Sequence, residues 1–192
     1  FIDVEEPPRI IVLTSPLPGD GKSTTAANLA LSLAAAGEPT VLIDADLRRP
    51  TLRKIFDLPD GPGLTDVLAG RVRLEDVVHR PGQTGHLVVL TAGRVPPNPS
   101  EVLGSKRMRE LLARLGGTAT VVVDSPPTLP VTDAAILSTA ADGVVVVVDA
   151  APSAREENRR AFELVRDAVL RAGTSVPVVV QLNKSDLADA LS

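Results

Sequence analysis

The sequence contains no cysteine, no tryptophan and no tyrosine, and only three phenylalanines in 192 residues. Without cysteine, neither a disulfide nor a thiolate metal site can hold the fold. With so few aromatic residues, the interior has to be built from valine, leucine, isoleucine and alanine, a composition that suits buried parallel strands covered by helices. No run approaches the roughly 20 apolar residues that a membrane-spanning helix needs, so no direct membrane insertion is expected.

An excess of positive charge is also missing, since the formal net charge is -4. This balance argues against a general nucleic-acid surface, and no nucleic-acid partner is expected. The local cluster of Arg48, Arg49 and Arg53 is interpreted as a solvated or interface feature, with phosphate contact as the alternative. The length predicts a single domain over residues 1–192. Because the first residue is Phe rather than Met, we expect a fragment or a processed product, and a cytoplasmic location is the default.

Apolar runs of strand length alternate with helical patterns along the chain, which is typical of repeated β-α-β units. The sequence therefore predicts an α/β fold with a three-layer, doubly wound, mostly parallel sheet. The irregular stretch 47–81 is expected to be an excursion over the sheet, and the prolines at 96, 97 and 99 a turn into a helix capped by Ser100. The expected strands are Ile10–Leu13, Val41–Ile43, Leu87–Leu90, Ala119–Val123, Val144–Val148 and Val176–Leu182. The expected helices are Lys22–Ala36, Ser100–Leu115, Thr132–Ala140 and Ser153–Ala172.

The strongest chemical signal follows the first expected strand, in the segment 15–24, which reads SPLPGDGKST. Its glycines let the backbone curl so that several N–H groups face one anion, and the helix that follows adds its positive N-terminal end. Lys22 can reach the outer phosphates of a nucleotide, and the Ser23 hydroxyl is suited to Mg²⁺. Pro16 stands where the usual pattern G-x-x-x-x-G-K-[ST] has its first glycine. The nucleotide contacts expected from this P-loop are Gly19, Asp20, Gly21, Lys22, Ser23 and Thr24.

Three aspartates lie at or just after the ends of apolar strands, Asp44 and Asp46 after one strand and Asp124 after another. Ligands of doubly wound sheets collect at the carboxyl ends of strands, where carboxylates can hold Mg²⁺ or accept a proton from an attacking hydroxyl. Any one of these aspartates alone could equally be a cap or turn residue. With the P-loop between them, we interpret Lys22, Asp44 and Asp46 as catalytic, and Ser23, Asp46 and Asp124 as metal ligands.

Five ordered motifs together resemble the cytoplasmic kinase domain of bacterial tyrosine kinases, which belong to capsule and exopolysaccharide machinery. The motifs lie at 15–28, 41–50, 63–70, 91–101 and 123–127. The resemblance implies a P-loop NTPase fold in which Lys22 and Ser23 form the Walker A pair and Asp124 is the Walker B aspartate. It also implies that one of Asp44 and Asp46 is the base. The implied reaction transfers the γ-phosphoryl group of ATP, with Mg²⁺, to a protein tyrosine hydroxyl.

The chain departs from that family in three ways. It has no tyrosine, whereas the family usually phosphorylates a C-terminal tyrosine cluster of its own, so we expect a protein substrate in trans. The family's assembly helix would lie upstream of residue 1, which leaves oligomerisation open. A missing upstream segment or a membrane activator would then place the protein at the inner face of the membrane. Finally, the tail from Asp142 onward resembles a small Ras-like GTPase, in which Asn183 and Asp186 would contact the base.

Two interpretations of this tail stay open. The Asp186 carboxylate could accept two hydrogen bonds from guanine, which would favour GTP over ATP. Alternatively, Asn183 meets the adenine edge, and Ser185 or Asp186 only caps a short final helix.

The leading functional hypothesis is an ATP-dependent protein-tyrosine kinase. One alternative is a nucleotide-hydrolysing switch, either a GTPase or a partition-type ATPase, and Leu17 counts against the partition type, which carries lysine at that point. The other alternative is an inactive or engineered nucleotide-binding scaffold.

Overall fold

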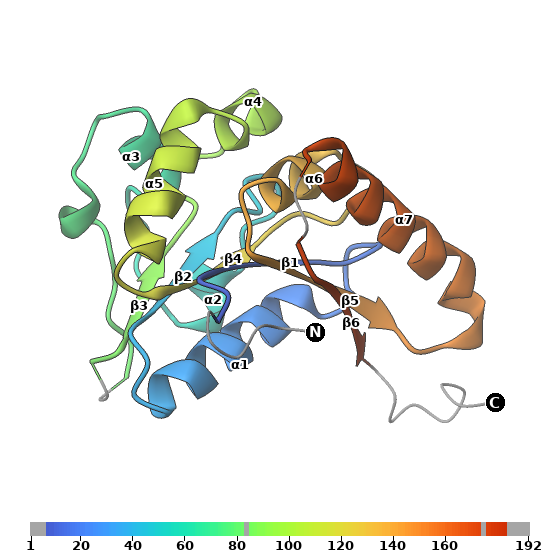
Figure 1. Cartoon of the computed structure of the whole chain (residues 1–192). Helices are drawn as coiled ribbons and strands as arrows, with labels where there is room; N and C mark the ends of the chain where they lie inside the picture. The colour runs from blue at the N-terminus through green and yellow to red at the C-terminus, as the bar shows by residue number, and fades with distance from the viewer. Residues whose placement is uncertain (1–6, 83–84, 174–175, 184–192) are drawn as a thin grey trace.

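Six parallel strands form a single sheet at the centre of the molecule (Figure 1). The structure is a computed structural model that describes residues 7–82, 85–173 and 176–183. The strand order is β3-β2-β4-β1-β5-β6, and every neighbouring pair of strands is parallel. The predicted doubly wound α/β fold is therefore confirmed, with a wholly rather than mostly parallel sheet. The strands are β1 Ile10–Thr14, β2 Thr40–Asp44, β3 Leu87–Leu90, β4 Thr120–Asp124, β5 Gly143–Asp149 and β6 Val178–Asn183.

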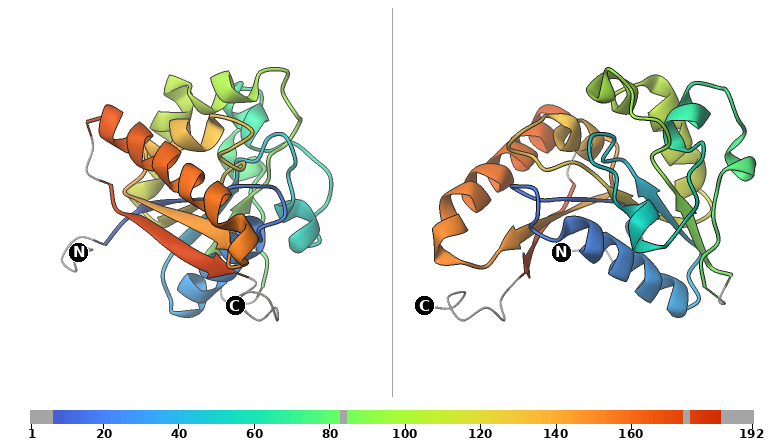
Figure 2. Two further views of the ribbon diagram at one scale, coloured as in Figure 1. Left: turned by 90° about the vertical axis from the view of Figure 1, so that its right-hand side faces the viewer. Right: turned by 180° about the vertical axis from the view of Figure 1, so that it is seen from behind.

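Helices cover both faces of the sheet, because successive side chains of the central strands point to opposite sides. Val12 of β1 packs into one hydrophobic cluster and its neighbour Leu13 into the other. Alanines of α1 and Leu52 of α2 belong to the second cluster, whereas residues from α3 to α7 belong to the first. Figures 1 and 2 show α1 beneath the sheet and α4 to α7 across the opposite face. The helices are α1 Lys22–Ala35, α2 Leu52–Ile55, α3 Leu64–Leu68, α4 Pro99–Leu103, α5 Lys106–Gly116, α6 Asp133–Ser138 and α7 Arg155–Arg171, with short 3-10 turns η1 Leu74–Asp76 and η2 Pro152–Ala154.

The helix predicted over Ser100–Leu115 is wrong in two respects. The segment forms two helices, α4 and α5, which are separated by Gly104 and Ser105. The Ser105 hydroxyl accepts a hydrogen bond from the Met108 backbone N–H at 3.2 Å and so begins a new helix, in the manner of an N-cap. Ser100 is not the cap of α4 either, because the helix begins at Pro99 and Ser100 lies inside it.

The motif at 63–70, in the excursion between β2 and β3, packs against the motif at 91–101, which follows β3. Gly63 and Gly93 approach so closely that a Cβ on Gly63 would lie 2.3 Å from the Thr91 carbonyl oxygen. The Leu64 backbone N–H donates to the same oxygen at 2.8 Å. Leu64 and Leu68 of α3 are buried in the core, so the excursion lies over the sheet as expected. The glycines of these motifs thus serve close backbone packing.

Strand β6 forms one edge of the sheet and ends at Asn183. Its side chains are more exposed than those of the central strands, and Val179, Val180 and Leu182 are about half exposed. Lys184, Ser185 and Asp186, on which the guanine interpretation depended, lie outside the described residues. In the described ranges, no helix is both long and apolar enough to cross a membrane.

Candidate nucleotide-binding site

The P-loop connects β1 to α1 and curls as its glycines predict. Gly19 and Gly21 have φ angles of 93° and 90°, in the left-handed region that side chains other than glycine rarely adopt. The first half of the loop is pinned to the segment after β4, because Thr128 donates its backbone N–H to the Ser15 carbonyl at 2.8 Å. Pro16, the departure from the usual pattern, is buried and accommodated without a positive φ. The following helix presents its N-terminus to the loop, which creates an anion-binding position.

Asp20 and Asn183 form hydrogen bonds that hold the P-loop backbone. The Asp20 carboxylate accepts a hydrogen bond from the Leu17 backbone N–H at 2.9 Å. The Asn183 side-chain amide donates to the Asp20 carbonyl at 2.7 Å, which ties the end of β6 to the P-loop. A Cβ on Gly21 would lie 2.2 Å from that amide nitrogen and would displace it, and the φ of 90° also favours glycine at this position. The structure therefore places Asn183, expected at the base, against the loop backbone.

Lys22 lies between two carboxylates. Its Nζ is 3.0 Å from Asp46 Oδ2, 3.1 Å from Asp124 Oδ1 and 3.1 Å from Ser23 Oγ. The three charged side chains are almost fully buried. Burial acts to lower the pKa of Lys22, but the negative charges of Asp124 and Asp46 outweigh it and raise the pKa. Lys22 therefore stays protonated, and its charge is available for an incoming anion.

Asp44 and Asp124 stand opposite each other in the register of β2 and β4. The Asp44 Oδ2 atom accepts hydrogen bonds from the backbone N–H groups of Thr51 and Leu52, both at 3.0 Å. Burial, together with the nearby charge of Asp124, raises the pKa of Asp44 to about 7. Burial also raises the pKa of Asp124. Asp44 thus fixes the start of α2 from a fully buried position.

A cavity of about 770 Å³ opens in front of the P-loop. The expected residues Gly19, Gly21, Lys22, Ser23, Thr24 and Asp46 line it. Asp20, Asp44, Asp124 and Asn183 lie behind this lining. Of the two acids considered as a base, only Asp46 therefore faces the cavity.

The far wall of the cavity contains residues that the sequence analysis did not assign to the site. Pro126 and Pro127 follow the end of β4 after Ser125, and they belong to the motif at 123–127, which was the signal that could have identified them. The wall consists of Arg48, Arg49, Thr51, Ile55, Pro126, Pro127, Pro130 and Val131.

Arg48 is held by two partners from other elements. Its Nε atom donates to Asp133 Oδ2 at 3.0 Å, and its Nη2 atom donates to Ser100 Oγ at 3.2 Å. Ser100 also donates to the Asp133 carboxylate. The Asp133 side chain is completely buried, whereas that of Arg48 is 40% exposed. The sequence analysis did not identify Asp133, because its partner Arg48 lies 85 residues away in the chain.

The oxygen atoms near Lys22 suit a magnesium nucleotide better than a metal bound by protein alone. Within the described ranges, no group of three or more His, Cys, Asp or Glu side chains is arranged to hold a metal ion. Mg²⁺ usually takes one or two protein ligands together with phosphate oxygens and water. The hydroxyl of Ser23 and the carboxylates of Asp46 and Asp124 offer such oxygens, and Asp124 Oδ2 has no hydrogen-bond partner among the described residues.

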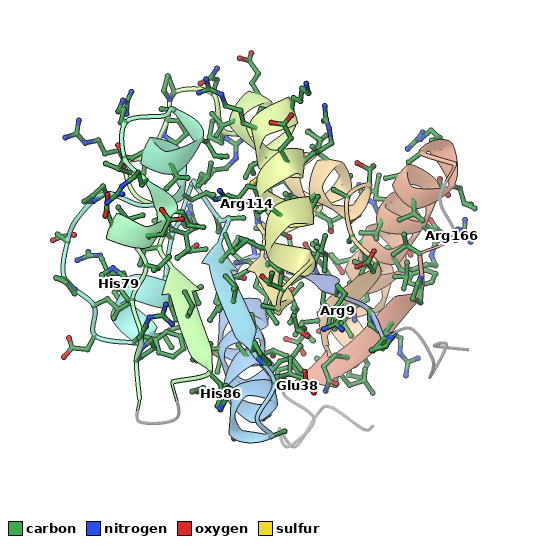
Figure 3. The ribbon with its side chains drawn as sticks, turned by 60° about the vertical axis from the view of Figure 1, so that its left-hand side comes forward. Arg9, Glu38, His79, His86, Arg114 and Arg166 are labelled. Carbon is green, nitrogen blue, oxygen red and sulfur yellow. The ribbon has the colours of Figure 1, made fainter. Side chains whose placement is uncertain are left out.

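Neither histidine belongs to the site. Figure 3 shows His79 and His86 beside β3, at the edge of the sheet. His79 pairs with Val89 through its backbone, and the His86 carbonyl accepts a hydrogen bond from Thr40. Both histidines therefore lie in surface and turn positions, and we assign them no role in the site.

Comparisons with known proteins agree with this geometry. A family model described as "ParA: NUBPL iron-transfer P-loop NTPase" matches residues 7–179. Tyrosine-protein kinase YwqD of Bacillus subtilis is 43% identical over 164 residues, which cover 85% of this chain and 69% of YwqD. Tyrosine-protein kinase CpsD of Streptococcus agalactiae is 37% identical over 157 residues, or 81% of this chain and 68% of CpsD. The solved kinase domain of VpsO superposes with a TM-score of 0.82 and 38% identity, covering 95% of this chain and 88% of VpsO.

The same comparisons correct the interpretation of the tail. The family match runs without a break to residue 179, and β6 pairs along its whole length with β5 of the same sheet. The resemblance of residues from Asp142 onward to a separate Ras-like GTPase therefore receives no support. The short four-residue pattern at 183–186 was too small a signal to define a second family.

Proposed function

Because this chain belongs to the bacterial tyrosine-protein kinases, P-loop NTPases linked to capsule and exopolysaccharide synthesis, we propose that its P-loop cavity binds MgATP and phosphorylates tyrosine in trans. The observation that carries the proposal is Lys22, a buried cation held 3.0 Å from Asp46 at the cavity wall. A cation placed between an anion-binding loop and a carboxylate is suited to phosphoryl transfer, which depends mainly on positioning and charge neutralisation.

The P-loop binds the phosphate groups of the nucleotide in this proposal. Backbone N–H groups from Gly19 to Thr24 surround the β-phosphate, and Lys22 turns from its two carboxylates toward the outer phosphates. The Ser23 hydroxyl and the carboxylates of Asp46 and Asp124 would hold Mg²⁺. The bound Mg²⁺ would neutralise negative charge that develops on the phosphate oxygens.

We assign the role of base to Asp46 rather than to Asp44. Asp46 faces the cavity, whereas both N–H groups bound by Asp44 belong to the start of α2. The tyrosine oxygen forms a bond to the γ-phosphorus as the bond from that phosphorus to the bridging oxygen of ADP breaks. The phenolic proton passes to the Asp46 carboxylate. Asp44 acts in this scheme as a positioning residue for the loop between β2 and α2.

No tyrosine lies within residues 1–192, so the acceptor tyrosine in this proposal lies outside them. We place the reaction in the cytoplasm at the inner face of the membrane, where an upstream segment or a membrane activator would bring the domain. Oligomerisation would depend on the same upstream segment. Residues 1–192 act as a single nucleotide-binding domain in this proposal.

ATP is the proposed nucleotide. The choice rests on the family to which the chain belongs, since the Asn183 amide is hydrogen-bonded to the P-loop backbone and does not distinguish adenine from guanine. Calorimetric titration with ATP and with GTP, each with Mg²⁺, tests the choice. Tighter binding of GTP would assign base recognition to Asp186 and contradict the kinase proposal.

The activity is tested by incubating the protein with radiolabelled ATP, Mg²⁺ and a copolymer of glutamate and tyrosine. We expect label on tyrosine with the wild type and its loss in Asp46→Asn, while nucleotide binding persists. A matched Asp167→Asn variant on the exposed face of α7 should keep full activity. Release of phosphate without labelled tyrosine would support a nucleotide switch instead, and binding without turnover would support an inactive scaffold.

A further inference from the structure

The cavity extends beyond the phosphate-binding loop into a chamber with an apolar wall. Pro126, Pro127, Pro130 and Val131 line one side of it, and Ile55 of α2 lines another, with 43% of its surface exposed. Rigid proline and aliphatic surfaces of this kind favour the flat face of an aromatic side chain. Asp46 stands at the boundary between this chamber and the P-loop.

Most of the charged groups around the chamber already have partners. Lys22 forms ion pairs with Asp46 and Asp124. The guanidinium of Arg48 is paired with Asp133, which is completely buried. Neither cation is therefore free to attract a second carboxylate from outside.

Arg49 is the exception. Its side chain is exposed and lines the cavity, and it forms no ion pair or side-chain hydrogen bond within residues 7–82, 85–173 and 176–183. Its backbone is nevertheless fixed, because the Arg49 N–H donates to Asp46 Oδ1 at 3.0 Å. An unneutralised cation is thus anchored directly beside the carboxylate assigned as base.

Resting on the proposed kinase function, we propose that Arg49 is a specificity-determining residue that selects acceptor tyrosines with an acidic residue close by in the sequence. An extended peptide advances about 3.3 Å per residue, so a carboxylate one or two positions from the tyrosine lies within reach of an arginine side chain. A guanidinium binds a carboxylate in a bidentate manner and keeps its charge at any physiological pH.

Because the protein carries a net negative charge, the local positive charge of Arg49 determines whether an acidic peptide is preferred at the cavity. With a net charge of -4, the molecule as a whole repels an acidic segment. Screening limits that repulsion to about 8 Å at physiological salt, so the nearest charge determines the preference. In the chamber, that nearest unpaired charge is Arg49.

The test compares two fluorescent peptides, one with a tyrosine between two pairs of glutamates and one with glutamines in place of the glutamates. Their affinities are measured by anisotropy with the full chain, Mg²⁺ and a non-hydrolysable ATP analogue. We expect the wild type to bind the glutamate peptide roughly fivefold more tightly, as for an ion pair at a partly exposed site. Arg49→Gln should lose this preference, Arg49→Lys should keep part of it, and all variants should bind the analogue equally.

Lys54→Gln is the matched control, because Lys54 is an exposed cation on α2 that does not line the cavity. It should keep the wild-type preference. Equal binding of the two peptides by the wild type, or no binding of either, would overturn the proposal. An unchanged preference in Arg49→Gln would do so as well, and weaker binding of the analogue by that variant would assign Arg49 to the phosphates.

A separate assay of phosphoryl transfer to the same peptides distinguishes the two proposals. If Arg49 governs peptide affinity but no phosphate is transferred, the kinase proposal fails and the inference about acidic segments stands. If both peptides are phosphorylated with equal kcat/KM and bound with equal affinity, the kinase proposal stands and the role of Arg49 fails.

Discussion

The molecule contains two sets of ion pairs with similar distances and opposite surroundings. At the carboxyl edge of the sheet, Lys22 lies 3.0 and 3.1 Å from two buried carboxylates. On α7, Arg159 lies 2.7 and 2.9 Å from Glu156 and Glu163, and all three side chains are substantially exposed. Distance alone therefore does not separate the two sets. What separates them is the cost of removing charge from water, which is large in the first set and small in the second.

The buried set is also incompletely satisfied. Asp44 and Asp124 lie opposite each other, and each has one carboxylate oxygen without a hydrogen-bond partner among the described residues. Their burial and mutual repulsion raise the pKa of Asp44 to about 7. Such an arrangement is poor as a source of stability but leaves acceptor oxygens beside the P-loop. The comparison thus predicts that changes at the sheet edge alter both function and stability, whereas changes on α7 alter neither.

The largest effect is expected from Lys22→Met. The variant removes the cation that contacts both Asp46 and Asp124, and phosphoryl transfer should fall on the order of 10³-fold, as when a preorganised donor is lost. Radiolabel transfer to the glutamate–tyrosine copolymer measures the effect, and circular dichroism checks that the variant folds. Lys54→Met, an equivalent change outside the cavity, should retain full activity. A Lys22→Met variant with more than about a tenth of wild-type activity would contradict the assigned role.

Asp44→Asn should change the pH dependence of stability. The pKa of Asp44 rises from 3.8 to about 7 on folding, so between these pH values the folded state keeps a proton that the unfolded state has released. The free energy of unfolding must therefore fall as pH rises through this interval, by about 1.4 kcal/mol for each pKa unit. Asparagine cannot titrate, and its amide oxygen can still accept from Thr51 and Leu52.

Urea unfolding at several pH values between 4 and 8 measures this change. The wild type should lose stability relative to Asp44→Asn as pH rises, although Asp124, whose pKa is also raised by burial, leaves part of the slope in the variant. Asp167→Asn on α7 should run parallel to the wild type. Parallel curves for Asp44→Asn would show that Asp44 is ionised in the folded state over the whole range.

Asp133→Asn should destabilise the protein by about 1–3 kcal/mol, because the Asn amide nitrogen cannot accept the hydrogen bond from Arg48 or Ser100 that a carboxylate oxygen accepts at this buried position. A double-mutant cycle with Arg48→Ala measures the coupling by urea unfolding. The exposed pair Arg166 and Asp167 provides the matched cycle on α7. Equal coupling in the two cycles would mean that burial does not set the strength of the Arg48 pair.

Much of the fold was predictable because its signals are local. Strand β3 has the predicted bounds Leu87–Leu90, and α1 ends one residue before the predicted Ala36. The P-loop was identified from its glycines and Lys22, and the aspartates from their places at strand ends. The single-domain expectation and the roles of the site residues stay predictions.

The remaining features depend on contacts between distant residues. Gly104 and Ser105 split one predicted helix into two, although apolar residues occur on both sides of them. Asp44 and Asp46 look alike in sequence, yet only the path of the loop into α2 decides which one faces the cavity. The Asn183 side chain contacts the Asp20 backbone, which is 163 residues away in the sequence, and no local sequence pattern predicts that contact.

The smallest effect is expected from Arg159→Ala. Both partners of Arg159 lie on the same exposed helix face, where water and salt screen the attraction and the long side chain gains freedom when the pair breaks. Alanine also favours the helix. Urea unfolding should therefore show no measurable shift in midpoint, at low or high salt. If Arg159→Ala were as destabilising as Asp133→Asn, burial would not be what distinguishes the two sets of ion pairs. The functional role assigned to the buried set would then lose its physical basis.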